Sequence, residues 1–150
     1  MTNFGRLFQI MAGLKYIETE CRDFILDRDY LFKGIIEEKR SAENSLIIRE
    51  SGAWVFPDNK KIKGTNTYRL SAADDRNLNL EHLRLGEKDP VFLLSFNKKG
   101  DNWVCESPHI CGADSYYADI KFSDDAMELE WRIKGPNKDM HIKTRYFSRQ

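Results

Sequence analysis

From Leu14 onward, apolar and polar residues alternate along most of the chain, and this two-residue period constrains the fold most strongly. Alternate side chains of a β-strand point to opposite faces of its sheet, so the pattern indicates strands with one apolar face. Clusters of Asp, Asn, Gly and Pro interrupt it about every eight to twelve residues, which is typical of sandwiches and barrels. The pattern predicts about nine strands, near residues 14–24, 30–39, 45–56, 61–70, 78–85, 91–96, 103–122 with an interruption, 127–134 and 140–147.

The links between the predicted strands are short. Short links favour antiparallel neighbours, because parallel strands need long crossover connections. Nine strands in one open sheet would leave two unpaired edges, and closing the sheet into a barrel removes them. We therefore expect a single all-β domain over residues 1–150, folded as an up-and-down antiparallel barrel of about eight to nine strands.

The N-terminal segment departs from the two-residue period. Its apolar residues recur at spacings of three and four, as on one face of a helix: Phe4, Leu7, Phe8 and Met11. Gly13 then offers a stop. A helix this short is marginal by itself, so we expect residues 1–13 to pack on the barrel or to cap it.

Composition excludes several classes of protein. Lys plus Arg and Asp plus Glu both number 24, so the chain lacks the excess of basic residues that nucleic-acid binding requires. No run approaches the roughly 18 apolar residues of a membrane-spanning helix. The three cysteines, Cys21, Cys105 and Cys111, form no disulfide framework and fit reduced thiols. We expect a cytoplasmic protein that is a monomer or weak dimer and binds neither nucleic acid nor membrane.

Strand parity places several polar residues on inward faces. Glu50 is in phase with apolar residues of its strand, as are His82 and Asp114 of theirs. The interior of a barrel of about eight strands holds either its own side chains or one small ligand. A buried carboxylate needs a partner, so these groups must satisfy one another or a guest molecule. Gly52, between Glu50 and Trp54, either opens space for a ligand or accommodates a neighbouring indole ring.

The segment HICGADSY combines an imidazole, a thiol, a carboxylate and a phenol within eight residues. One interpretation is an acid–base or ligand-contacting site at the barrel mouth, in which His109 and Asp114 titrate and Tyr116 donates a hydrogen bond. The alternative is a structural bend in which Pro108 and Gly112 break the strand, Asp114 caps backbone amides and Cys111 packs as a small apolar residue.

The same region raises the question of a metal. Cys105, His109 and Cys111 carry ligand atoms that suit zinc, but their spacing matches no standard pair of ligand knuckles. Phosphate-binding glycine loops and the Gly-x-Ser-x-Gly motif of serine hydrolases are also absent from the sequence. We expect no metal and no cofactor.

Several segments resemble an uncharacterised calycin-like β-barrel family, a domain of unknown function. The similarity covers most of the chain after Phe32 and is most specific in HICGADSY, in ELEWRIKGPNKDM and in TRYFSR. The family pattern reads His-x-Cys-x-x-Asp-x-Tyr and, later, Gly-Pro-x-Lys-Asp. The resemblance implies a lipocalin-like barrel without an established activity. Its motif positions fall on His109, Cys111, Asp114, Tyr116, Trp131, Gly135, Pro136, Lys138 and Asp139. Tyr16 stands where calycins often carry a tryptophan on the barrel floor.

Three functional hypotheses follow. The first is a barrel that binds a small apolar or aromatic molecule; its candidate ligand-binding residues are Glu50, Trp54, Tyr68, His82, His109, Cys111, Asp114, Tyr116, Trp131 and Lys138. The second is an isomerase or lyase that uses His109 and Asp114 as an acid–base pair, with Tyr116 as a further catalytic candidate. The third is a barrel filled by side chains that acts as a protein-interaction domain. We favour the first.

Overall fold

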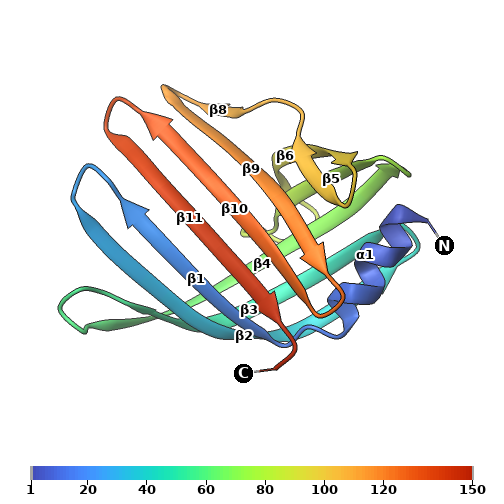
Figure 1. The fold of residues 1–150 in the computed structure, drawn as a ribbon, viewed down its shortest axis with the longest axis horizontal. Coiled ribbons are helices and arrows are strands. Elements are labelled where there is room, and N and C mark those ends of the chain that lie inside the picture. The colour runs from blue at the N-terminus through green and yellow to red at the C-terminus, as the bar shows by residue number, and fades with distance from the viewer. Residues whose placement is uncertain (1, 150) are drawn as a thin grey trace.

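A computed structural model describes residues 2–149 as one helix followed by eleven strands (Figure 1). Met1 and Gln150, which the predicted helix and domain include, lie outside the described residues. The elements are α1 (Asn3–Ala12), β1 (Tyr16–Asp23), β2 (Arg28–Ala42), β3 (Ser45–Val55), β4 (Lys61–Asp74), β5 (Asn77–His82), β6 (Val91–Lys99), β7 (Asn102–Cys105), β8 (His109–Cys111), β9 (Asp114–Ser123), β10 (Ala126–Gly135) and β11 (Lys138–Phe147).

Ten of the described strands close an antiparallel barrel. From β1 to β7 each strand pairs with the next, β7 pairs with β9, and β9 to β11 continue the ring until β11 pairs with β1. Strand β8 pairs with β9 alone and lies outside the ring. The predicted all-β antiparallel barrel with one short helix is confirmed, but the predicted number of eight to nine strands is wrong.

The error lies in the segment that was expected to form one interrupted strand at 103–122. It forms three strands, β7, β8 and β9. Pro108 has no backbone N–H to pair and separates β7 from β8, while Gly112 adopts a φ of 62° in the tight turn before β9. The chain reverses direction there, so that Trp103 of β7 pairs with Ile120 of β9.

A row of three glycines lets the barrel wall bend sharply. Gly34 of β2 pairs with Gly52 of β3, which pairs with Gly64 of β4. A Cβ at Gly52 would overlap the carbonyl oxygen of Lys33 and lie 2.6 Å from the Cα of Gly34. The Phe32 ring covers the same spot. The space at Gly52 is therefore filled by β2, and holds neither a ligand nor an indole ring.

Helix α1 packs its apolar stripe into one end of the barrel, where Leu7 and Met11 are fully buried in the main core. Lys39 of β2 holds the helix end, since its Nζ donates to the carbonyl oxygens of Ala12 and Leu14 at 2.6 and 2.9 Å. Asn3 bonds to Asp75 in the β4–β5 turn at the same end. None of the helices between residues 2 and 149 is long and apolar enough to cross a membrane.

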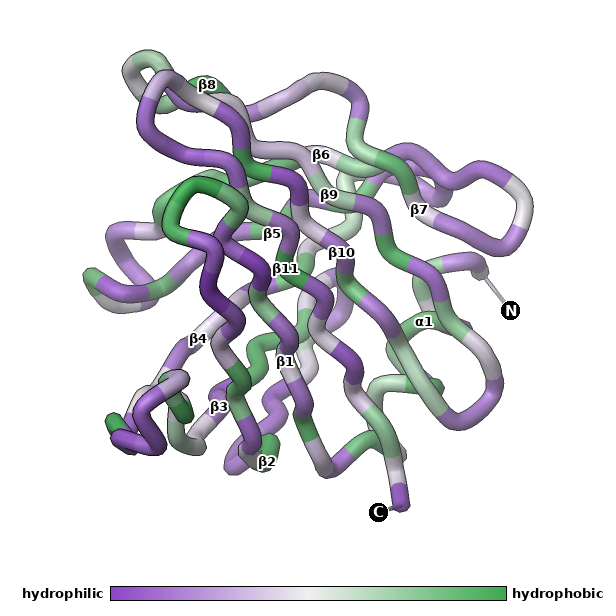
Figure 2. Tube along the Cα trace, turned by 60° about the vertical axis from the view of Figure 1, so that its left-hand side comes forward, coloured by the Kyte–Doolittle hydropathy of each residue, from purple (hydrophilic) through white to green (hydrophobic). Residues whose placement is uncertain are grey.

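The two faces of the wall follow the sequence period. Along β10, Met127, Leu129 and Ile133 are buried and Trp131 shares their face, whereas the alternate residues Glu128, Glu130 and Arg132 are polar (Figure 2). The other strands also direct mainly apolar residues inward. They supply the core beside α1 and, farther along the barrel axis, the walls of a cavity.

Candidate functional site

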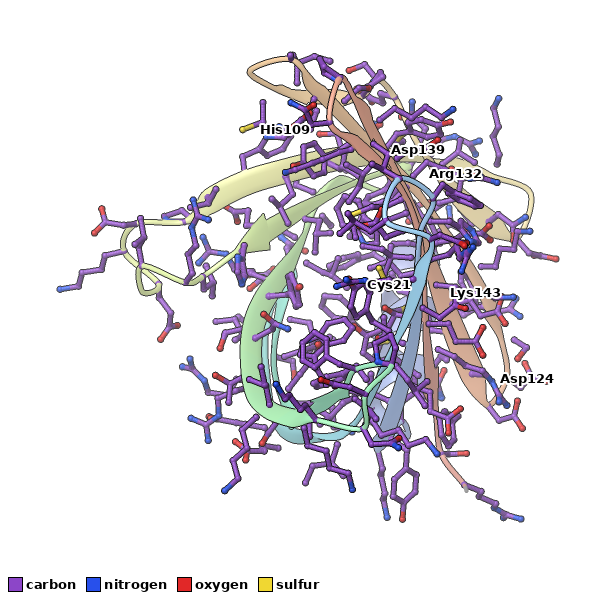
Figure 3. The ribbon with its side chains drawn as sticks, turned by 90° about the vertical axis from the view of Figure 1, so that its left-hand side faces the viewer. Cys21, His109, Asp124, Arg132, Asp139 and Lys143 are labelled. Atoms are coloured by element: carbon purple, nitrogen blue, oxygen red, sulfur yellow. The ribbon has the colours of Figure 1, made fainter. Side chains whose placement is uncertain are left out.

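The barrel interior is hollow on the side away from α1. A cavity of about 450 Å³ lies there, and every described strand except β7 contributes to its wall. His109 of β8 and Arg84 of the β5–β6 loop are among its lining residues. His109 lies at the end of the barrel opposite Asp124 of the β9–β10 turn (Figure 3). We call this cavity the lumen. Because α1 covers the other end, the lumen has its mouth at the β8 end.

The buried polar centre of the lumen is Glu50, which is 4% exposed. Tyr146, from the opposite wall, donates its hydroxyl hydrogen bond to Oε2 of this carboxyl group. Burial raises the pKa of Glu50 from 4.5 to about 7, and the hydrogen bond from Tyr146 opposes part of that rise. The carboxyl group therefore exchanges its proton close to neutral pH.

Beside Glu50, Thr19 and Thr144 form a second buried polar pair, with their hydroxyl oxygens 2.9 Å apart. Burial and the nearby Glu50 raise the pKa of both Tyr68 and Tyr146, so the two phenols keep their protons. The inner lumen thus presents hydroxyl groups, the Asn66 amide and one carboxyl group among apolar and aromatic side chains.

Aromatic side chains form much of that wall. Trp54 packs on Phe32 with ring centroids 5.2 Å apart, and Tyr68 stacks on His82 at 5.0 Å. Trp131 lies on β10 across the lumen. Burial, together with the charge of Arg84, lowers the pKa of His82, which keeps its imidazole neutral at pH 7.

A second polar group lies at the rim. Lys138 Nζ donates to the Tyr116 hydroxyl at 3.1 Å and forms an ion pair with Asp114 at 3.4 Å. These two partners raise the pKa of Lys138. The Asp114 carboxylate lies against Gly135 of the β10–β11 hairpin, where no Cβ would fit. Its side chain is 23% exposed, so Asp114 is half-buried at the rim.

Eight of the ten candidate residues line the lumen, and Asp114 and Lys138 lie at its rim. The proposed acid–base pair is not brought together: among residues 2–149, no carboxylate accepts a hydrogen bond from His109. Its ring instead faces Tyr116 edge-on, with centroids 6.2 Å apart. Cys111 is exposed at the mouth, and all three cysteines are free.

No group of three or more His, Cys, Asp or Glu side chains within the described part of the chain is arranged to hold a metal ion. Cys105 lies on β7, and Cys111 on β8 outside the barrel ring. The three-residue set considered from sequence is therefore not assembled around one point.

Sequence reasoning missed Tyr146 as a site residue. Its parity marks it as inward, but so does that of many core residues, and the pattern does not indicate that Glu50 lies opposite. Asn66 and Arg84 also line the lumen and were not predicted. Strand parity on residues 61–70 could have found Asn66, whereas Arg84 lies in a loop after β5, where parity gives no direction.

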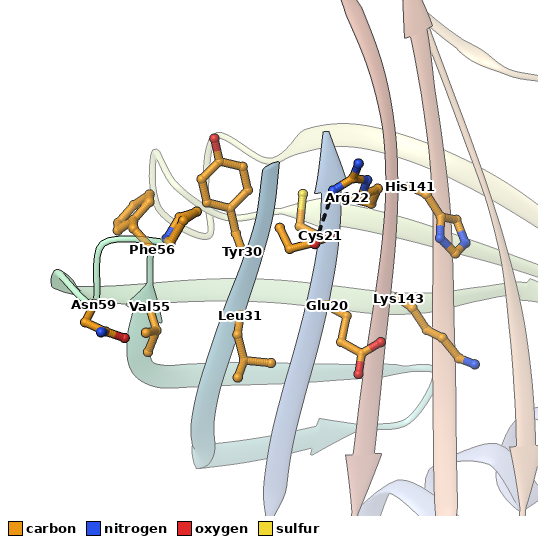
Figure 4. A pocket seen from close by; sticks show the side chains of 12 residues that line it. Glu20, Cys21, Arg22, Tyr30, Leu31, Val55, Phe56, Asn59, His141 and Lys143 are labelled. Carbon is orange, nitrogen blue, oxygen red and sulfur yellow. Dashed lines mark hydrogen bonds and ion pairs between the residues drawn. The ribbon is translucent and has the colours of Figure 1, made fainter. Parts of the chain in front are cut away.

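A second hollow, also about 450 Å³, lies beside the β1–β2 hairpin and the β3–β4 loop (Figure 4). Several of its charged groups already have partners: Arg22 forms ion pairs with Asp27 and Asp29, and His141 contacts Glu130 at 2.6 Å. Burial raises the pKa of its thiol, Cys21, to about 11, which makes this sulfur a poor nucleophile. The lumen is the better candidate site.

Comparison with known proteins is consistent with this architecture. The sequence pattern of a family described as of unknown function, DUF6314, matches residues 13–148, which confirms the predicted resemblance to such a family. A search of curated proteins found no significant match. Among solved structures, the chain is similar to S-type phycobiliprotein lyase CPES from Guillardia theta, with 12% identity, a TM-score of 0.65, and coverage of 100% of this chain and 94% of that chain. A redesigned β-barrel, mFAP1, bound to DFHBI, has 10% identity and a TM-score of 0.42, with coverage of 93% of this chain and 97% of that chain.

Proposed function

We propose that this chain, which belongs to the DUF6314 family of unknown function, binds a small apolar or aromatic molecule in the lumen of its barrel. The observation that carries the proposal is the cavity of about 450 Å³ within the closed wall, covered by α1 at one end. Ligand pockets of small molecules have volumes of roughly 300–1,000 Å³ and apolar walls with few polar groups. Trp54, Tyr68 and Trp131 give this lumen such a wall.

The polar groups of the lumen are suited to orienting a ligand. Glu50 and His82 lie inside, and Asp114 and Lys138 lie at the rim. An empty volume of this size does not favour a barrel filled by its own side chains. An enzyme that uses His109 and Asp114 as an acid–base pair has less support, because Asp114 pairs with Lys138 and His109 faces Tyr116. Three free thiols fit a cytoplasmic protein, and we propose a monomer or weak dimer without a cofactor.

Titration with Nile red, a neutral dye whose fluorescence rises in apolar sites, tests this function. Val91 lines the lumen, whereas its neighbour Phe92 faces outward and is 49% exposed. Val91→Trp should place an indole ring in the cavity, reduce the space for the dye and weaken its binding by about tenfold or more, which corresponds to at least about 1.4 kcal/mol. The matched control, Phe92→Trp, should bind as the unchanged protein does.

Thermal unfolding of both variants checks that each is folded. Lack of dye binding by the unchanged protein, or equal binding by the two folded variants, would show that the lumen is not a ligand site.

A further inference from the structure

The Glu50 carboxyl group has one oxygen engaged and one available. Oε2 accepts the hydrogen bond of Tyr146, while Oε1 has no hydrogen-bond partner among residues 2–149. Glu50 is a lining residue of the lumen and only 4% exposed. The available oxygen is therefore an acceptor inside a cavity whose wall includes the rings of Trp54, Tyr68 and Trp131.

The chain supplies no cation to this acceptor. Within the described residues no Lys, Arg or His forms an ion pair with Glu50, whereas Glu81, Glu128 and Glu130 on the outer wall each have such a partner. The titratable groups nearest the inner lumen are Tyr146 of β11, Tyr68 of β4 and His82 of β5, and none of them carries a positive charge at neutral pH. Farther out, the mouth holds Arg84, His109, Cys111, Tyr116, Asp114 and Lys138.

Given the proposed function, we infer that the ligand is a flat aromatic compound with a protonated nitrogen that contacts Glu50. A buried carboxylate without a cation is costly, and a ligand cation removes that cost by direct pairing. The rings of such a compound match the walls formed by Trp54 and Trp131, since aromatic faces attract both aromatic rings and cations.

The affinity of the lumen for a cation should depend on pH. The pKa of Glu50 is about 7 in the empty lumen, so near neutral pH about half of the molecules hold the proton. A cation against the carboxylate favours its charged form and lowers this pKa, so binding below pH 7 releases a proton. Affinity for a cation therefore rises as pH increases through about 7 and levels off above it.

Two dyes separate this inference from the proposed function. Nile red is neutral and reports whether the lumen binds an apolar ring system; 9-aminoacridine stays a cation throughout the range and reports the pairing with Glu50. Between about pH 5.5 and pH 8.5, 9-aminoacridine affinity should rise about tenfold or more, and Nile red affinity should change less than about twofold.

Variants assign the effect to one carboxyl group. Glu50→Gln retains an acceptor for the Tyr146 hydroxyl and should weaken 9-aminoacridine binding by about tenfold to a hundredfold, as expected for loss of one charge-assisted hydrogen bond. It should also abolish the pH dependence and leave Nile red binding within about twofold. Glu128→Gln is the matched control, because it removes the same charge from the outer wall, where Glu128 pairs with Lys143 at 3.8 Å.

The possible results are distinct. If Nile red binds and 9-aminoacridine binds with no pH dependence, or equally well to Glu50→Gln, the lumen is a ligand site but the inferred cation is wrong. If neither dye binds the unchanged protein, the proposed function fails with it. Retained Nile red binding shows that Glu50→Gln is folded with its lumen intact.

Discussion

Gly52 and Gly64 occupy paired positions in one row of glycines, yet the structure predicts opposite results when each becomes alanine. A Cβ at Gly52 would overlap the Lys33 carbonyl oxygen and crowd the Cα of Gly34, both of which are backbone atoms fixed in the sheet. A Cβ at Gly64 would meet the Trp54 ring at 3.5 Å, an ordinary van der Waals contact. The two substitutions add the same methyl group to neighbouring strands, so each controls for the other.

The magnitudes follow from these contacts. Overpacking against fixed atoms costs about 1–3 kcal/mol, and backbone atoms cannot move aside as a side chain can. Replacing glycine with alanine also restricts the unfolded chain, which favours folding by about 0.4–1 kcal/mol. With the upper end of that cost, because the contacts are to backbone atoms, Gly52→Ala should lower the free energy of unfolding by about 2 kcal/mol, and Gly64→Ala should change it by less than about 1 kcal/mol in either direction.

Urea unfolding followed by circular dichroism measures both values. For a chain of this length, a loss of about 2 kcal/mol corresponds to a fall in Tm of roughly 4–8 °C. Equal stability of the two variants would refute the idea that close approach of β2 and β3 at Gly52 produces the bend of the wall.

Two further predictions concern carboxyl groups. Folding raises the pKa of Glu50 from 4.5 to about 7, so protonation of this residue stabilises the folded protein. The contribution to the free energy of unfolding, about 3 kcal/mol, is fully present below pH 4.5 and is lost as pH rises through 7. Urea unfolding at several pH values should show this change as a difference from Glu50→Gln, and parallel profiles would contradict it. Asp114→Asn should lower the free energy of unfolding by less than about 1 kcal/mol, since Lys138 is 47% exposed and solvent screens the pair. A measured loss near 3 kcal/mol would show that the rim supports the fold.

The barrel and its faces could be predicted because both depend on local pattern. The alternation at 127–134 distinguishes the inward residues Leu129 and Ile133 from their polar neighbours, and the structure buries them. The number of strands could not be read in this way. In the segment 103–122 the apolar period is interrupted around Pro108, but the interruption does not tell whether the chain continues or turns back. That depends on the pairing of β9 with both β7 and β10.

The candidate site was predicted in part, for a related reason. Inward parity marks Glu50, and aromatic content marks Trp54 and Trp131, so most of the lumen wall follows from single strands. The Lys138 ion pair with Asp114 joins residues of two different strands at the rim. The predicted pairing of Asp114 with His109 used proximity in sequence, but β8 and β9 form a hairpin in which His109 is opposite Tyr116 instead.

Glu50 and Glu128 show why the chemistry of the lumen depends on closure of the barrel. Both are glutamates on strands with the same two-residue period, and sequence assigns each to a face. On the outer wall, solvent and Lys143 stabilise the charge of Glu128, whose side chain is 34% exposed. Glu50 is instead opposite Tyr146, a residue 96 positions away that reaches it only after β11 pairs with β1. A phenol can donate a hydrogen bond but cannot neutralise a carboxylate, so burial on closure of the barrel leaves Glu50 with a pKa of about 7.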